Sequence, residues 1–98
     1  MIVREEKEGT TLTVAPEGRM DTLSSPELEQ FLRDRYDGAR QIVLDLAKVE
    51  YISSAGLRLI IQAHKAMKDK DGLLLRSVPQ QVMDVLKTTG YTHVVKIV

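Results

Sequence analysis

The N-terminal third of the chain alternates apolar and polar residues in the way that β-strands do. A short apolar stretch begins at residues 2–4, and residues 10–15 are rich in β-branched residues and alternate, with Leu12 and Val14 as the apolar positions. The charged segment between them ends in Gly9, which predicts a turn. We therefore expect an antiparallel hairpin whose second strand is closed by Pro-Glu-Gly at residues 16–18.

Three later segments show apolar residues at helical spacing, and each opens with residues typical of a helix start. The pair Ser24-Ser25, followed by Pro and Glu, predicts one start, with either serine as the N-cap. The pair Ser53-Ser54 predicts a second start, and Pro79 predicts a third. The expected helices cover residues 24–38, 53–68 and 78–90.

Further apolar runs between the helices predict buried strands. The run Leu73-Leu74-Leu75 suits burial on both faces. The expected strands cover residues 41–46, 73–77 and 94–98. The resulting order is β-β-α-β-α-β-α-β, which predicts an α/β domain with a mixed, mostly parallel sheet and right-handed crossovers. Partner sites in such folds lie beyond the carboxyl ends of the parallel strands, here the loops that begin at Gly18, Ala47 and Ser77.

The amino-acid composition excludes several classes of protein and of site. Ninety-eight residues predict one domain, residues 1–98. The 14 basic and 14 acidic side chains cancel, so nucleic acid is not the expected partner. No cysteine is present, which excludes disulfides and thiolate metal sites. No uninterrupted apolar run exceeds three residues and no signal peptide is apparent, so we expect a cytoplasmic protein without direct membrane insertion.

The stretch from Leu44 to Arg58 carries the most specific chemistry. A strand ends, a short loop follows, and Ser53 and Ser54 begin a helix, with Gly56 in its first turn. Backbone N–H groups and the helix dipole favour negative charge at such a position, so a phosphoryl group on either serine would be stabilised there. In the same interpretation Gly56 allows the backbone of a docking partner to approach closely. The alternative is that the serines are ordinary N-caps and the glycine relieves crowding within the fold, and local physical chemistry alone favours this alternative about two to one.

This stretch, LDL followed by AKVEY and ISSAGL, resembles the signature of STAS domains, the sulfate-transporter and anti-sigma-factor-antagonist family. Gly18-Arg19-Met20-Asp21 matches a second motif of that family, and the segment 86–91 matches a third. The three motifs occur in the family's order and span the chain. The resemblance is to the bacterial anti-sigma factor antagonist branch.

The resemblance implies a phosphorylation-controlled binding switch. A dephosphorylated antagonist binds an anti-sigma factor that has a kinase-type ATP-binding fold, and this binding frees a sigma factor. The anti-sigma factor then acts as a kinase and phosphorylates a serine at a helix start of the antagonist. A serine phosphatase of the Mg/Mn-dependent class removes the phosphoryl group. Aligning the Gly-Leu pair places the modified serine at Ser54, with Ser53 as second choice. Asp45 is expected to order its loop. The implied partner-binding residues are Asp21, Ser53, Ser54, Ala55, Gly56, Leu57 and Arg58.

The chain departs from the family pattern on both sides of Ser54, the serine expected to be phosphorylated. Ser53 stands where many members have Asp, and Ala55 stands where many have Ser. Three other interpretations remain. A scaffold subunit of a lipid-transport ATPase complex or of a stress-sensing assembly would need no phosphorylation. A serine hydrolase is disfavoured because G-x-S-x-G is absent and His64 lies ten residues beyond Ser54, roughly 15 Å along a helix. Asp69–Gly72 resembles part of a calcium loop but is expected to be a turn. No catalytic residue, metal or cofactor is predicted.

Overall fold

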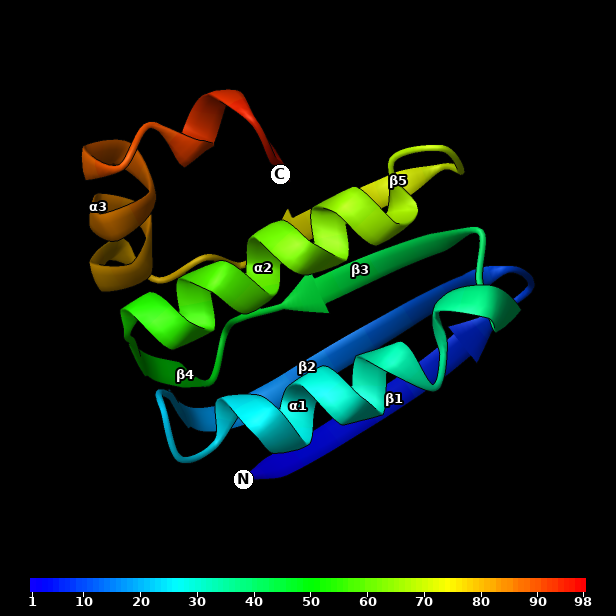
Figure 1. Ribbon diagram of the computed structural model, residues 1–98, viewed down its shortest axis with the longest axis horizontal. Helices are drawn as coiled ribbons and strands as arrows, with labels where there is room; N and C mark the ends of the chain where they lie inside the picture. The colour runs from blue at the N-terminus through cyan, green and yellow to red at the C-terminus, as the bar shows by residue number, and fades with distance from the viewer.

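A six-stranded sheet carries two helices on one face and a third helix at one end (Figure 1). The computed structural model describes residues 1–98. The strands are β1 (Ile2–Glu8), β2 (Thr11–Met20), β3 (Gln41–Asp45), β4 (Val49–Ile52), β5 (Gly72–Arg76) and β6 (Lys96–Ile97). The helices are α1 (Ser25–Arg33), α2 (Ser54–Met67) and α3 (Gln80–Thr88), with 3-10 turns at Tyr36–Gly38 and Tyr91–His93. None of the three helices has the length and apolar character needed to span a membrane.

The sheet is mixed and mostly parallel, as the sequence predicts. The strand order is β1-β2-β3-β5-β6, and β4 pairs with β2 outside this path. Strands β1 and β2 form the expected antiparallel hairpin, while the β2–β3, β3–β5, β5–β6 and β2–β4 pairs are parallel. Helices α1 and α2 lie side by side in front of the sheet (Figure 1).

Strand β2 divides its pairing between two neighbours. Residues Thr11–Val14 pair with β3, whereas Gly18–Met20 pair with β4. The register shifts between Gly18 and Arg19, and Gly18 has φ +102°, which a residue with a side chain rarely adopts. This bulge turns the end of β2 toward β4, so that Met20 lies beside Ile52, just before α2 begins.

Several predicted boundaries are wrong, and β4 is missing from the predicted order. The first strand continues through the charged residues to Glu8, because an exposed edge strand tolerates charged side chains. Strand β2 passes through Pro16 and Gly18 to Met20 instead of ending there. Helix α1 stops at Arg33, with a separate 3-10 turn before Gly38. The last strand is only two residues long.

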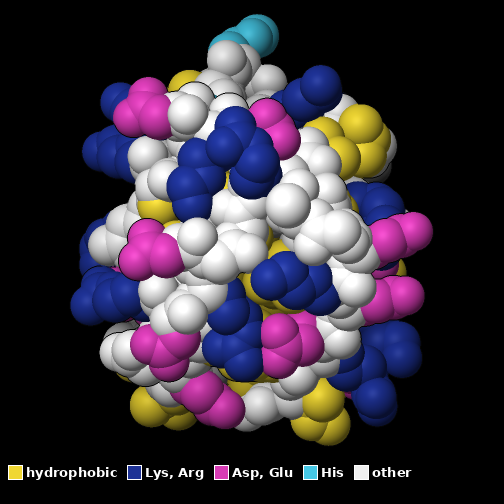
Figure 2. Space-filling model, turned by 90° about the vertical axis from the view of Figure 1, so that its right-hand side faces the viewer, with side chains coloured by type: hydrophobic (Ala, Val, Ile, Leu, Met, Phe, Trp, Pro, Cys, Tyr) yellow, Lys and Arg dark blue, Asp and Glu magenta, His cyan; other side chains and the backbone are white.

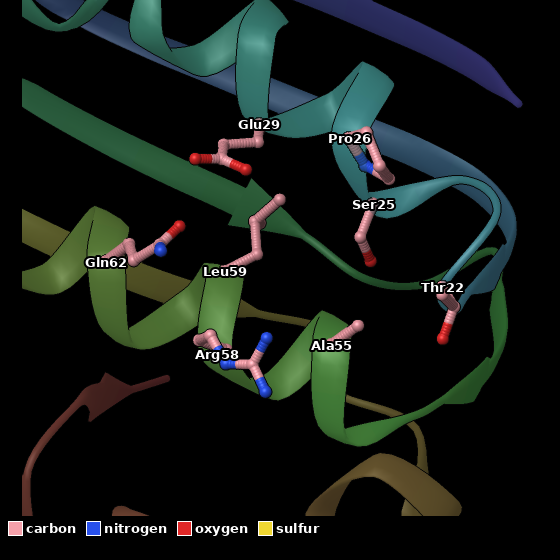
Figure 3. Close-up of a pocket in the computed structure, with 8 residues that line it drawn as sticks. All are labelled: Thr22, Ser25, Pro26, Glu29, Ala55, Arg58, Leu59 and Gln62. Carbon is pink, nitrogen blue, oxygen red and sulfur yellow. The ribbon is translucent and has the colours of Figure 1, made fainter.

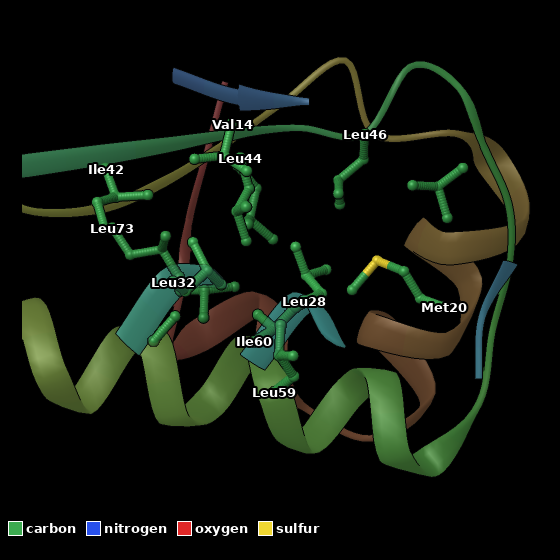
Figure 4. Packing of buried hydrophobic residues seen from close by; sticks show 14 of the residues in the cluster. Val14, Met20, Leu28, Leu32, Ile42, Leu44, Leu46, Leu59, Ile60 and Leu73 are labelled. Atoms are coloured by element: carbon green, nitrogen blue, oxygen red, sulfur yellow. The ribbon is translucent and has the colours of Figure 1, made fainter. Parts of the chain in front are cut away.

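The core lies between the sheet and the two front helices (Figure 4). Alternate residues of the central strands point toward the helices, and an apolar stripe on each helix meets them. The fully buried side chains of this layer include Val14, Ile42, Leu44, Leu75, Leu28, Leu32, Ile60 and Met67. This packing fixes α1 and α2 relative to the carboxyl ends of β2 and β4.

Candidate functional site

Helix α2 begins at a capped and anchored serine. Ser53 is the N-cap, and its hydroxyl oxygen accepts hydrogen bonds from the backbone N–H groups of Ala55 (3.2 Å) and Gly56 (3.5 Å). Its own N–H donates to the carbonyl oxygen of Met20 at 2.9 Å. The hydroxyl of Ser53 therefore already serves the fold, and its backbone is tied to the end of β2.

Ser54, the first residue of α2, differs from its neighbour in both exposure and bonding. It is exposed, and its hydroxyl makes no hydrogen bond within the chain. Neither histidine forms a hydrogen bond with Ser53 or Ser54. The structure thus separates the two serines into a structural N-cap and a free hydroxyl at the positive end of a 14-residue helix.

Two residues expected on the partner surface are instead buried. A Cβ atom on Gly56 would lie 2.5 Å from the Met20 carbonyl oxygen and 2.9 Å from side-chain atoms of Ile52 and Met20. The close backbone approach that Gly56 permits is therefore internal, between α2 and β2, and not toward a partner. Leu57 is 9% exposed and belongs to the core. Both residues position the start of α2, while Ala55 is half-buried and Arg58 is exposed.

Asp21 organises the loop between β2 and α1, residues 21–24, which we call the Asp21 loop. Its Oδ1 atom accepts hydrogen bonds from the N–H groups of Leu23 and Ser24, both at 3.1 Å, and Oδ2 accepts one from Arg19 at 3.3 Å. The Ser24 hydroxyl donates in turn to the carbonyl of Arg19. The bond from the Ser24 backbone N–H, with those from Arg19 and Leu23, lowers the pKa of the Asp21 carboxyl below its usual value. The carboxylate makes no bond to Ser53 or Ser54, so it shapes its own loop.

This loop displays a hydrophobic side chain that the sequence interpretation missed. Leu23 is 90% exposed, although the Asp21 bonds hold its backbone in place. Tyr51 of β4 is 41% exposed, and the Arg19 guanidinium lies 4.2 Å from the centre of its ring. We call Arg19, Leu23, Tyr51, Ser54 and Arg58 the carboxyl-end surface, because they lie at or beyond the carboxyl ends of β2 and β4.

The opposite end of the molecule has a different character. Figure 2 shows Lys and Arg side chains interspersed with Asp and Glu, with hydrophobic side chains only in small separate patches. Arg35 and Arg40 belong to ion pairs with Glu5 and Asp71. Such mixed charge is typical of a solvated face, which leaves the carboxyl-end surface as the candidate for binding.

Asp45 has the structural role expected for it. Its Oδ2 accepts a hydrogen bond from Arg76 at 2.9 Å, and its Oδ1 accepts one from the Ala47 N–H at 3.0 Å. Partial burial raises the pKa of the Asp45 carboxyl, but these two bonds and the Arg76 charge outweigh burial and hold the pKa below its usual value. Asp45 thereby joins the ends of β3 and β5 and orders the loop that leads to β4.

Comparison with known proteins gives one consistent family. The family model described as "Mlab, STAS domain" matches residues 3–97. The chain is 35% identical over 75 residues to the anti-sigma-B factor antagonist of Staphylococcus aureus, covering 74% of this chain and 69% of that protein. It is 32% identical over 80 residues to BtrV of Bordetella bronchiseptica, covering 80% of this chain and 69% of that protein.

Solved structures show the same fold at lower identity. An anti-sigma factor antagonist from Mycobacterium paratuberculosis superposes with a TM-score of 0.90 at 21% identity, covering 98% of this chain and 83% of that one. Bacillus SpoIIAA in its phosphorylated form gives 0.78 at 12% identity, covering 99% and 91%.

The chain belongs to the STAS domain family. The predicted fold class and the predicted function, an anti-sigma factor antagonist, are confirmed by these relatives. The modified serine, the kinase-type partner and the phosphatase stay predictions.

Proposed function

We propose that phosphorylation of Ser54 switches this antagonist between binding and releasing its partner. The dephosphorylated chain binds an anti-sigma factor with a kinase-type ATP-binding fold through the carboxyl-end surface, and a sigma factor is freed. The kinase then phosphorylates Ser54 and the complex separates. The family and the names of the relatives support an anti-sigma factor as the partner.

The observation that carries this proposal is the difference between the two serines. Ser54 is exposed and its hydroxyl is unbonded, so a kinase can reach it without disturbing the fold. Ser53 is half-buried and caps α2, so modifying it would remove the cap. The structure therefore favours Ser54 over the second choice, Ser53.

The phosphoryl transfer is an ordinary kinase step. The Ser54 hydroxyl oxygen attacks the γ-phosphorus of ATP, an O–P bond forms, the β–γ anhydride bond breaks, ADP leaves, and a base on the kinase takes the hydroxyl proton. In the reverse direction, a phosphatase of the Mg/Mn-dependent class directs water at the phosphorus, and inorganic phosphate leaves.

Charge explains why the modified form would dissociate. A serine hydroxyl readily finds a hydrogen-bond partner inside an interface. A phosphoryl group instead adds nearly two negative charges, and burying it in the interface removes the water that hydrates it. A penalty of about 3 kcal/mol lowers the affinity by more than a hundredfold. No rearrangement of the core is required, because Ser54 lies outside it.

Leu23 and Tyr51 supply the apolar part of the same interface. The backbone of the Asp21 loop is held by hydrogen bonds, so it loses little freedom when the exposed Leu23 binds. This loop directly follows Met20, whose carbonyl oxygen accepts the N–H of Ser53 at the start of α2. The partner is therefore expected to offer an apolar pocket for Leu23 beside the catalytic end of its ATP site.

The test is intact-mass measurement and peptide mapping of the protein isolated from its own cells with phosphatase inhibitors present. One phosphoryl group on the peptide that contains Ser54, absent from a Ser54→Ala variant and retained in an Arg40→Gln control, is expected. A phosphoryl group on Ser53 would preserve the switch and refute the choice of serine. Purified anti-sigma factor and ATP should reproduce the modification in vitro.

A protein that stays unmodified through growth and stress would contradict the switch. The result would favour the second candidate, a scaffold subunit of a transport or stress-sensing assembly, in which the same surface binds constitutively.

A further inference from the structure

The N-terminal turns of α1 and α2 meet at a pocket that shares only Arg58 with the carboxyl-end surface. Its volume is about 210 Å³, several times the roughly 30 Å³ that a water molecule occupies in the liquid. Figure 3 shows Thr22 and Ser25 on the α1 side and Ala55 and Arg58 on the α2 side. Glu29 and Gln62 line its far part.

Ser25 has the one buried polar side-chain atom in the protein that lacks a partner. The residue is 7% exposed, and its hydroxyl oxygen makes no hydrogen bond. The hydroxyl points from α1 toward the first turn of α2 (Figure 3). Because buried hydroxyls are nearly always hydrogen-bonded, this one indicates a partner that the chain does not itself provide.

Arg58 is also unpartnered. Six of the seven arginines form ion pairs with carboxylates within the chain, and Arg58 is the exception. It is the fifth residue of α2, close to the end of the helix where an anion is favoured. The carboxylate on the opposite wall, Glu29, is already paired with Arg33 at 2.5 Å.

We propose that this pocket is a phosphate-binding site, in which the Arg58 guanidinium and the Ser25 hydroxyl donate hydrogen bonds to phosphate oxygens. Two helix N-termini, of 9 and 14 residues, add positive potential at the same place. Thr22 supplies a further hydroxyl at the rim. An arginine and two hydroxyls suit an oxyanion better than an apolar or cationic ligand.

The phosphate can come from two sources. One is free phosphate, which makes the site independent of the proposed switch. The other is a phosphoryl group on Ser54, one helical turn before Arg58 and therefore on the same side of α2, which rests on the proposed function. In the second case Arg58 draws the phosphoryl group toward the pocket.

The first experiment measures thermal unfolding of the unphosphorylated chain with increasing inorganic phosphate, at ionic strength held constant with sodium chloride. A ligand that binds the folded state raises the unfolding temperature in a saturable way. We expect this rise in the parent protein and in the Arg40→Gln control. Arg58→Gln should weaken phosphate binding about tenfold, the usual effect of losing a charge-assisted hydrogen bond.

The Ser25→Ala variant distinguishes a loss of phosphate binding from a loss of stability. Removing an unbonded buried hydroxyl should leave the unfolding temperature in chloride alone unchanged or higher. The same variant should lose most of the phosphate-dependent rise. A structural serine would show no such difference between the two salts.

The second experiment uses protein carrying phosphoserine at position 54 and follows the phosphorus resonance against pH. If the phosphoryl group occupies the pocket, its second pKa, ordinarily about 6, is lower in the parent than in Arg58→Gln or Ser25→Ala. Free phosphate should then no longer raise the unfolding temperature. A continued response to free phosphate, with an unshifted phosphoserine, assigns the site to free phosphate.

Equal phosphate responses in the parent, Arg58→Gln and Ser25→Ala, together with an unshifted phosphoserine, would overturn the site. That result leaves the proposed switch standing, because the modification of Ser54 in cells is read independently by mass.

Discussion

Gly56 tests whether the start of α2 is fixed by its contact with β2. Replacing it with alanine places a Cβ atom 2.5 Å from the Met20 carbonyl oxygen and 2.9 Å from the Met20 Cβ. Neither atom is the free end of a flexible side chain, and the Met20 carbonyl already accepts the Ser53 N–H at 2.9 Å. The clash can be relieved only by moving α2 away from the strand.

The magnitude follows from two opposing effects. Overpacking of a tight contact costs about 3 kcal/mol, at the upper end of the usual range because backbone is involved. Alanine regains about 1 kcal/mol through its better helix propensity. The free energy of unfolding of Gly56→Ala should therefore fall by about 2 kcal/mol, which lowers the unfolding temperature by roughly 8–16 °C for a domain of this size.

Urea unfolding followed by far-ultraviolet circular dichroism measures this loss. Gly38→Ala is the matched control, because the nearest atom to its new Cβ would be the flexible Lys7 amine at 3.9 Å. Its stability should stay within about 0.5 kcal/mol of the parent. A Gly56→Ala protein as stable as the parent would refute the argument that this contact holds the helix start.

Three further predictions concern the cap, the loop carboxylate and the exposed leucine. Ser53→Ala should lower the free energy of unfolding by about 1 kcal/mol through loss of the N-cap, while Ser54→Ala changes it by less than about 0.5 kcal/mol; equal effects in urea unfolding would contradict the assigned roles. Because the folded-state pKa of Asp45 lies below its ordinary 3.8, the chain gains stability above that value and loses it as pH falls through the folded pKa. Urea midpoints from neutral to acid pH should therefore drop more steeply for the parent than for Asp45→Asn, and parallel curves would exclude this contribution. Leu23→Ala should leave the unfolding temperature unchanged but weaken binding to the anti-sigma factor about tenfold by calorimetry, and unchanged affinity would remove Leu23 from the interface.

Local patterns predicted most of the fold, and the misses have physical causes. The helix starts at Ser53-Ser54 and near Ser24-Ser25 depend on capping, a local interaction that short sequence segments encode. Strand β4 could not be found this way, because it has only four residues and its two buried residues stand three positions apart, which is a helical spacing and not the alternation of a strand. It forms because the bulge at Gly18 leaves the end of β2 without another neighbour.

The sequence could group the candidate site residues but could not assign their separate roles. The family resemblance names Asp21 and Ser54 together among the partner-binding residues, and the hydrogen bond from the Ser53 N–H to the Met20 carbonyl oxygen joins the two segments that carry them. That Gly56 faces inward and that Leu23 projects into solvent depend on tertiary packing, which no pattern within a few residues of either position encodes. The bonds of Asp21 are different, because they join residues only two or three positions apart and are the local turn contacts typical of Asp.

The anchoring of Ser53 and Gly56 against Met20 has a consequence for how such proteins diversify. The contacts that fix the helix start are internal, whereas the side chains of the proposed partner surface, Leu23, Ser54 and Arg58, are exposed and lie outside the core. Outward positions can therefore change between gene copies without loss of the scaffold. Several proteins with this fold can therefore act in one cell, each binding a different partner.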